Sequence, residues 1–211
     1  NLSAEELVQA NNPLATKKTI NIHNYVISSL YGLPDVTMNS LMVRYAQPLG
    51  RVFLRASMPF MMSNAPGLGP TTGYGDFSLF AIYTFPKEPK GFNIGVGPML
   101  VMPTGNNGFG DGKWQAGLSA VAFFSKSPVI QYGMLLEWQM SFASKKDSTY
   151  SERESVNTLI PQLFFMWQLG AGTYLRSTAT WSFDPKHGNT KMPLGRGQGK
   201  VIKAGKALLN I

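Results

Sequence analysis

The sequence contains no cysteine, which excludes disulfide bonds, iron–sulfur clusters and zinc sites with cysteine ligands. It also lacks the roughly 18 consecutive apolar residues that a transmembrane helix needs. Charged residues make up only 14% of the chain, against about 25% in soluble domains. A membrane β-barrel stays possible without a long apolar run, because only every second residue of its strands faces lipid.

No secretion signal is recognisable at the start of the sequence, because Asn1, Leu2 and Ser3 do not provide a basic beginning followed by an apolar core. We therefore expect an exported protein to be present here in its mature form. With 211 residues, the chain is expected to form a single domain that is large enough to close a barrel.

A capping box predicts a short helix near the N-terminus. Ser3 is placed as the N-cap and Glu6 follows three residues later, so the helix should cover residues 4–10 and stop before Pro13. We assign residues 1–18 to a periplasmic segment that contains this helix. The helix either tethers the terminus or acts as a plug or a docking peptide for a partner protein.

The stretch 91–124 predicts one long β-hairpin, because two runs with apolar residues at alternate positions flank a loop rich in Gly and Asn. Phe92, Ile94 and Val96 share one face of the first run, and Trp114 and Leu118 share one face of the second. A period of two is typical of a strand that is apolar on one side only. These runs exceed the usual strand of about 5–6 residues and match the roughly 9–11 residues that cross a bilayer.

Similar runs continue along the chain, and no helical period interrupts them. Strands are predicted near residues 19–30, 38–47, 52–60, 76–85, 92–102, 113–125, 129–142, 156–169, 173–182, 193–201 and 206–211. Their connections alternate in length, with long ones at 31–37, 61–74, 104–112, 144–153 and 183–192 and short ones at 48–50, 86–90, 126–128 and 170–172. Outer-membrane barrels have the same polarity, with tight periplasmic turns and long outer loops.

We therefore predict an all-β fold, namely an antiparallel up-and-down transmembrane β-barrel of about 12 strands in residues 19–211. Bacterial barrels have an even number of strands and both termini in the periplasm, whereas the sequence stops partway along an outward strand. We expect the last strand to be missing from this sequence. A soluble barrel of the lipocalin type, which also alternates apolar and polar residues, is the alternative.

Several short motifs resemble the outer-membrane barrels grouped as putative transporters of the phenol-degradation meta-pathway. They are Gly75-Asp76-Phe77, Gly97-Pro98, Pro103-Thr104-Gly105, Gly110-Asp111-Gly112-Lys113-Trp114, Trp138-Gln139-Met140-Ser141-Phe142 and, before the first strand, Asn12-Pro13-Leu14-Ala15. The resemblance spans most of the chain from Asn12. It implies a Gram-negative outer-membrane barrel and, more weakly, the transport of aromatic compounds.

If the bulky faces of the strands look outward, charged and amide side chains line the lumen. These residues are Arg44, Arg55, Lys113, Gln115, Gln131, Glu137, Gln139, Gln162, Gln168 and Arg176. Because basic residues outnumber acidic ones in this set, an open water path would favour the passage of anions. Equally, ion pairs between Glu137 and the arginines would close the interior and serve only a structural role. Larger inward residues could form an apolar conduit or simple filler; they are Phe80, Met99, Phe123, Phe164 and Met166.

Other functional classes are disfavoured. The chain has 19 Lys and Arg against 11 Asp and Glu, a net charge of +8, but the basic residues are scattered and form no basic helix, so we expect no nucleic-acid partner. Neither His23 nor His187 lies in a His-x-Ser pair, and we predict no enzymatic activity, metal or cofactor. Asp76 and Asp111 lie at loop ends and are expected to stabilise turns. Gly105, Gly108, Gly110 and Gly112 are expected to form a hairpin loop rather than a phosphate-binding loop, because no helix follows them.

The sequence thus predicts a channel or uptake protein for small solutes, aromatic compounds among them, in the bacterial outer membrane. Its partners would be outer-membrane lipid and lipopolysaccharide, to whose anionic surface the net positive charge is suited. The alternative is a closed structural barrel that serves as an anchor, or that docks a partner protein through the long loops or the N-terminal helix.

Overall fold

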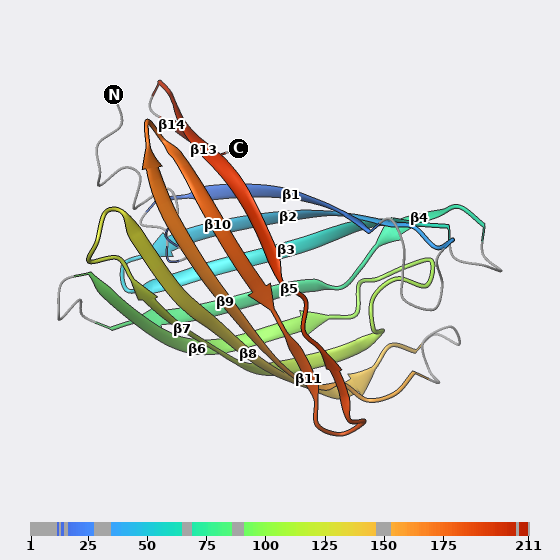
Figure 1. Ribbon diagram of the computed structural model, residues 1–211. Helices are drawn as coiled ribbons and strands as arrows, with labels where there is room; N and C mark the ends of the chain where they lie inside the picture. The colour runs from blue at the N-terminus through green and yellow to red at the C-terminus, as the bar shows by residue number, and fades with distance from the viewer. Residues whose placement is uncertain are drawn as a thin grey trace.

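Long strands, joined in chain order, make up the computed structural model (Figure 1). The structure describes residues 12, 14, 17–27, 35–64, 69–85, 91–146, 153–205 and 207–210. The strands in this part of the chain are β1 Thr19–Ile27, β2 Met38–Leu49, β3 Val52–Ser63, β4 Thr71–Tyr74, β5 Phe77–Thr84, β6 Phe92–Met102, β7 Lys113–Phe124, β8 Ile130–Ser144, β9 Asn157–Gly170, β10 Thr173–Thr180, β11 Ser182–Asp184, β12 Asn189–Lys191, β13 Gly195–Ala204 and β14 Ala207–Asn210. The described residues contain no helix, and the expected helix at residues 4–10 lies outside them.

The strands form one 14-stranded antiparallel sheet, in which eleven follow the order β1-β2-β3-β5-β6-β7-β8-β9-β10-β13-β14. The other three lie beside this path: β4 pairs with β3, β11 with β9, and β12 with β11. The predicted all-β meander is therefore confirmed. About 12 strands were expected from the parity of bacterial barrels, and the additional short strands β4, β11 and β12 arise within two of the long loops. The long and short connections alternate along the chain as predicted from the sequence.

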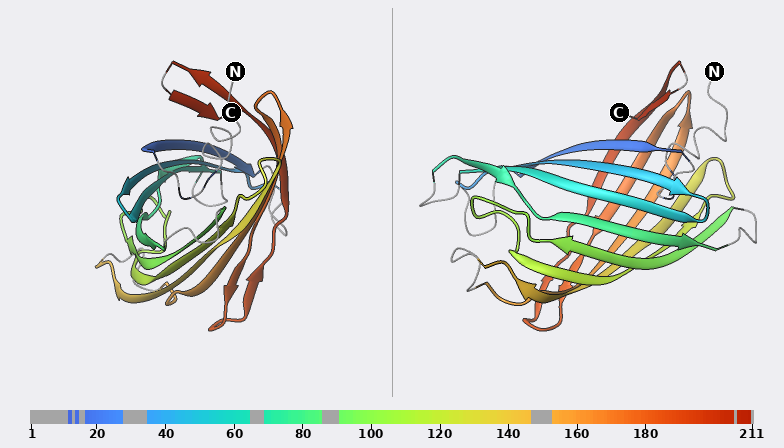
Figure 2. Two further views of the ribbon diagram at one scale, coloured as in Figure 1. Left: turned by 90° about the vertical axis from the view of Figure 1, so that its left-hand side faces the viewer. Right: turned by 180° about the vertical axis from the view of Figure 1, so that it is seen from behind.

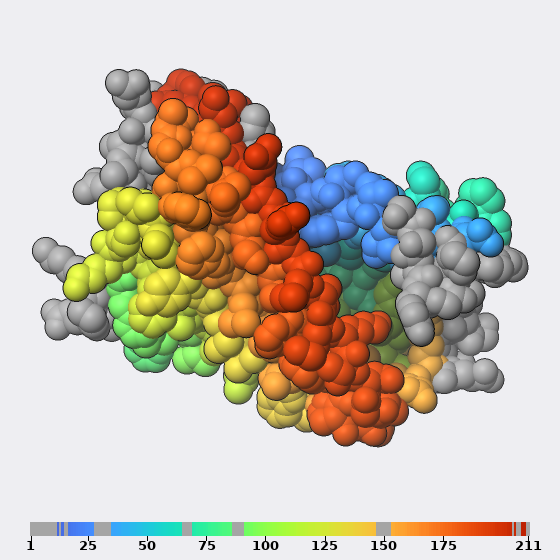
Figure 3. Space-filling view, in the orientation of Figure 1, coloured from blue at the N-terminus to red at the C-terminus, as the bar shows by residue number. Residues whose placement is uncertain are grey.

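The sheet curls around an interior, but hydrogen bonds do not close it into a barrel within the described residues. Strand β1 stands at one end of the strand order and β14 at the other. Figure 2 shows the curl from its end, with the β13–β14 hairpin and β1 as the two edges. Figure 3 shows a recess between β1 and β13, with side chains of other strands at its floor.

The two faces of the sheet differ in exposure. On β7, Trp114, Leu118 and Phe124 are exposed on what we call the outer face, while Gln115 and Ser119 are fully buried on the inner face. Residues paired across strands share a face, so the alternation continues around the sheet. The inner face is therefore the side that encloses the interior.

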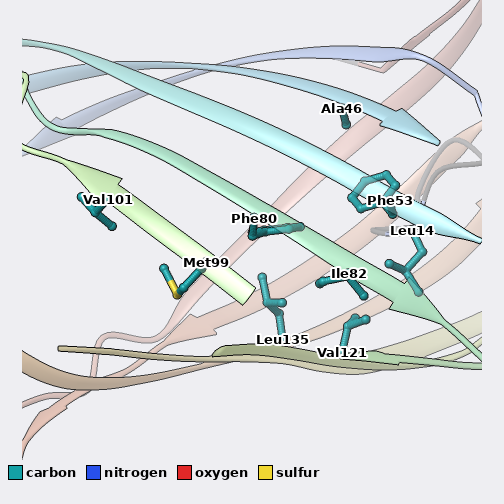
Figure 4. Close-up of a cluster of buried hydrophobic side chains, with 9 residues drawn as sticks. All are labelled: Leu14, Ala46, Phe53, Phe80, Ile82, Met99, Val101, Val121 and Leu135. Carbon is teal, nitrogen blue, oxygen red and sulfur yellow. The ribbon is translucent and has the colours of Figure 1, made fainter. Parts of the chain in front are cut away.

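Apolar side chains fill part of the interior. One cluster of buried residues consists of Leu14, Ala46, Phe53, Phe80, Ile82, Met99, Val101, Val121 and Leu135 (Figure 4). A second cluster contains Phe123, Met166, Tyr174 and Val201, and Phe164 packs against both. Leu14 precedes the first strand and is the one described residue of that segment in the cluster.

The strands β5 to β8 approach one another closely at inner-face glycines. A Cβ atom on Gly97 would lie 1.7 Å from the carbonyl oxygen of Ala81, and one on Gly117 would lie 1.7 Å from that of Trp138. Only glycine fits this approach, because any side chain would push the paired strands apart.

Hydrogen bonds organise the connection between β6 and β7 as a hairpin loop, as expected. The Asp76 carboxylate accepts bonds from the backbone N–H of Gly105 (2.9 Å) and of Asp111 (2.6 Å). The Arg153 side chain donates to the carbonyl of Gly108 at 2.7 Å and also to that of Gly110. The prediction that Asp76 serves a turn is confirmed, and the loop is tied to both of its neighbouring connections.

Candidate functional site

Five inner-face side chains form the most highly charged part of the interior. They are His23 on β1, Arg44 on β2, Arg55 on β3, Glu137 on β8 and Arg176 on β10, and we call them the charged belt. Each occupies an inward position of its strand, because successive side chains alternate between the two faces. The belt thus combines residues from both ends of the strand order.

Arg55 and Glu137 form an ion pair across the interior. Nη2 of Arg55 lies 3.3 Å from Oε1 of Glu137, 82 residues away in the sequence. The Arg55 guanidinium also lies over the ring of Phe80, 4.1 Å from its centroid, which is a favourable cation–π arrangement. The pairing of Glu137 with an arginine, which the sequence left open, is therefore present.

Arg44 and Arg176 approach His23 instead of a carboxylate. Nη1 of Arg44 lies 2.8 Å from Nδ1 of His23, and a guanidinium can only donate, so Nδ1 is the acceptor. Arg176 is close enough to His23 to interact with it electrostatically, and its Nε donates to Oγ1 of Thr178 at 3.1 Å. The belt therefore holds three guanidinium groups and one carboxylate, an excess of positive charge.

Two further predicted lumen residues lie toward the long loops and bond locally. Nζ of Lys113 donates to Oγ of Ser144 at 2.9 Å, and Nε2 of Gln115 donates to Oδ2 of Asp111 at 2.8 Å. Both side chains are buried on the inner face. Their hydrogen bonds join β7 to the rim of the sheet, so the structure does not bring them into the charged belt.

The remaining predicted amides also lie on the inner face. Gln131 is fully buried and Gln168 nearly so, and neither amide group has a hydrogen-bond partner among the described residues. Gln139 and Gln162 are half-buried. Buried polar groups in proteins are nearly always hydrogen-bonded, to protein or to water, so this inner wall is suited to water or to a polar solute.

The larger inward residues that the sequence singled out are packed in the apolar clusters. Phe80 and Met99 belong to the first cluster, Phe123 and Met166 to the second, and Phe164 touches both. They adjoin the charged belt, since Phe80 is paired with Arg55 across β3 and β5.

His23 belongs to the charged belt, and Tyr25 contacts it from the same strand, although the sequence analysis placed neither residue in the lumen. Oη of Tyr25 lies 3.2 Å from Nδ1 of His23. Both residues alternate with the exposed Ile20, Ile22 and Val26 along β1. The period of two was therefore the available signal for their inward position.

The second histidine lies apart from the belt, next to β11. Nδ1 of His187 is 2.7 Å from Oδ2 of Asp184, and its Nε2 is 3.4 Å from Oε2 of Glu154. The hydrogen bond with His187 lowers the pKa of Asp184 from its ordinary value. Neither histidine hydrogen-bonds a serine among the described residues.

Two further searches of the described residues gave negative results. No group of three or more His, Cys, Asp and Glu side chains is arranged to hold a metal ion there. In the same part of the chain, no helix has the length and apolar character that spanning a membrane requires.

Comparison of the chain with protein-family models, with curated proteins and with solved structures found no match. The resemblance to the phenol-degradation meta-pathway barrels therefore stays a prediction. What is established is a large antiparallel β-sheet protein with a charged inner face.

Proposed function

We propose that this protein is a β-barrel of the bacterial outer membrane that conducts or takes up small solutes. The observation that carries the proposal is the distribution of side chains between the two faces. Large apolar residues stand exposed on the outer face, for example Ile22 at 63%, Leu118 at 51% and Trp167 at 48%. The inner face buries lysine and glutamine, and its arginines are half-buried.

A soluble barrel would require the opposite distribution. Water-soluble proteins rarely expose contiguous apolar patches larger than a few hundred Å², because such patches associate. They also rarely bury Lys or Arg unless these residues are paired. A lipid-facing exterior around a polar interior accounts for both departures, and it is the pattern of outer-membrane barrels.

The dimensions of the strands support the same proposal. β2, β3 and β7 contain 12 residues each, β9 contains 14 and β8 contains 15, all sufficient for a tilted crossing that takes about 9–11 residues. Aromatic side chains stack on the outer face near the short turns, where Phe124 lies between Phe92 and Tyr132 with ring centroids 4.4 and 4.9 Å apart. Aromatic rows of this kind are typical of membrane interfaces.

In a membrane, the backbone N–H and C=O groups at the two edges of the sheet must find hydrogen-bond partners. Unpaired backbone N–H and C=O groups cost several kcal/mol each in hydrocarbon, so a spanning sheet has to close. The barrel therefore closes between β1 and the β13–β14 end, directly or through a further strand. Its apolar exterior contacts outer-membrane lipid, and its long loops reach the lipopolysaccharide.

A closed structural barrel is the second candidate function, and the filled part of the interior favours it. Leu14 lies among the side chains of the first apolar cluster, and the Arg55–Glu137 ion pair crosses the interior. A barrel obstructed in this way would anchor or dock a partner protein rather than conduct.

Single-channel recording of the full chain refolded into planar bilayers separates the two candidates. Discrete conductance steps are expected for the channel, and silent membranes that contain folded barrel would support the structural alternative. Quenching of tryptophan fluorescence by brominated lipid serves as the control for insertion. Trp138 and Trp167 are exposed on the outer face, so quenching is expected in either case, and its absence would contradict the membrane location itself.

A further inference from the structure

Two of the three arginines in the charged belt lack a carboxylate partner among the described residues. The single carboxylate of the belt, Glu137, is already paired with Arg55. Arg44 donates to a neutral acceptor on His23, and Arg176 donates to the hydroxyl of Thr178. A guanidinium carries five N–H donors, so most donors of Arg44 and Arg176 have no further hydrogen-bond partner in the part of the chain that the structure describes.

The positions of these two arginines suit the binding of one anion. Arg44 on β2 contacts the His23 imidazole at 2.8 Å, and Arg176 on β10 occupies an inward position near enough to the same imidazole to act on it electrostatically. Two like charges repel in a low-dielectric interior, and an anion between them converts this repulsion into charge-assisted hydrogen bonds. Arginine is well matched to a carboxylate, because its planar fork can bind both oxygens.

Apolar side chains adjoin the charges on the same inner face. Phe80 is paired with Arg55 across one ladder and with Met99 across the next. Both apolar residues are buried. Leu135 lies two positions before Glu137 on β8 and is also buried, so the first apolar cluster borders the charges of the belt on this face.

We propose that the charged belt is a binding site for small organic carboxylates with an apolar body. Arg44 and Arg176 hold the carboxylate group, and Phe80 and Met99 contact the apolar body. The Arg55–Glu137 pair adds one charge of each sign and therefore no net charge to the site. This inference rests on the function proposed above, because a solute has to reach the interior.

Equilibrium dialysis with radiolabelled benzoate tests the site directly on the full chain folded in detergent micelles. Arg44→Gln and Arg176→Gln are each expected to weaken binding about tenfold, the loss of one charge-assisted contact. Lys200→Gln removes the same charge from the outer face and is expected to leave binding unchanged. Glu137→Gln is expected to tighten binding, since it removes the competing carboxylate.

Competition by analogues of benzoate tests the charged and the apolar parts of the site one at a time. Benzamide is expected to compete poorly because it lacks the charge, and acetate poorly because it lacks the apolar body. Benzamide equal to benzoate, or a Lys200→Gln effect as large as that of Arg44→Gln, would overturn the inference. If Arg44→Gln does not fold, Arg44→Lys keeps the charge without the planar fork, and an intermediate loss of affinity is then expected.

The binding and conductance experiments fail independently. A folded barrel that conducts ions but does not bind benzoate contradicts the carboxylate site and leaves the channel proposal in place. A barrel that binds benzoate in micelles but stays silent in bilayers contradicts conduction while supporting the site.

Discussion

The two faces of this sheet are built from the same strands but suit opposite environments. On β7, Leu118 faces outward and is half exposed, while its neighbour Ser119 faces inward and is fully buried. Among the described residues no side chains cover the apolar surface of the outer face, and the inner face carries charges and amides. This contrast is the basis of our proposal that the outer face meets lipid, since a polar interior inside an apolar exterior is the pattern of outer-membrane barrels.

The outer face is itself uneven. Around β7 to β9 it presents Leu118, Trp138 and Trp167, whereas on β13 the outward positions carry Arg196, Gln198 and Lys200. Register fixes this assignment, because Gln198 is paired with Leu175 and Leu175 with Trp167. The wall at β13 is therefore the least suited to lipid in the described part of the sheet.

The largest effect is expected from placing a charge at the middle of the outer face. Leu118→Arg should lower the free energy of unfolding in lipid vesicles by about 2–4 kcal/mol, the cost of arginine near a bilayer midplane. Urea titration in vesicles measures it. In water, the same change at a half-exposed site would be nearly neutral, within about 0.5 kcal/mol.

Gln139→Arg is the matched control on the inner face of β8, two strand positions from Glu137. Gln139→Arg should lower the free energy of unfolding far less than Leu118→Arg does, because the inner face is polar. Equal costs for the two substitutions would remove the distinction between the faces, and with it the main support for a lipid-facing exterior.

These faces and strands could be predicted from the sequence because both are local properties. A period of two fixes which residues share a face, and turn residues fix where a strand ends, so most of the strand bounds differ from the prediction by only a few residues. The short strands β4, β11 and β12 were missed, since each forms by pairing inside a long connection. The burial of Leu14 could not be predicted, because the residue lies before the first strand and no alternating pattern includes it.

The charged belt was predictable only in part. Alternation placed Arg44, Arg55, Glu137 and Arg176 on one face. Their convergence depends on the curl and stagger of the sheet, which bring β3 opposite β8 and β1 near β10. Closure of the barrel also depends on strands that are far apart in the sequence. The sequence predicted a closed barrel, but no hydrogen bonds join the first strand to the last within the described residues.

A smaller effect is expected where inner-face glycines allow two strands to approach. Gly117→Ala places a Cβ atom 1.7 Å from the Trp138 carbonyl oxygen, so β7 and β8 must separate. We expect a loss of about 1–3 kcal/mol, typical of overpacking, in the same urea titration. Gly197→Ala on β13 is the control, since no atom lies within 4 Å of its Cβ position, and it should be nearly neutral.

The Arg55–Glu137 ion pair should contribute less to the free energy of unfolding, and its contribution should require both residues. Glu137→Gln leaves the Arg55 guanidinium without its carboxylate, and Arg55→Met leaves the carboxylate without its cation. Each change should cost about 1–2 kcal/mol, whereas the double variant should cost less than the sum of the two. A double-mutant cycle measures the coupling energy; a value of zero would show that the pair does not stabilise the curl of the sheet.

The smallest effect is expected at β13, where the outer face is polar already. Lys200 is paired with Thr173, next to the short turn after β9, so its aliphatic stem can lie along the wall while its ammonium reaches the lipid headgroups. Lys200→Gln should therefore change the free energy of unfolding by less than about 0.5 kcal/mol in neutral vesicles. Vesicles with anionic headgroups should enlarge the difference, because a lysine near such a surface contributes about 1 kcal/mol of attraction. A loss that is large and independent of lipid charge would instead place Lys200 against protein, and β13 would then be the wall at which the barrel meets a further strand or a partner.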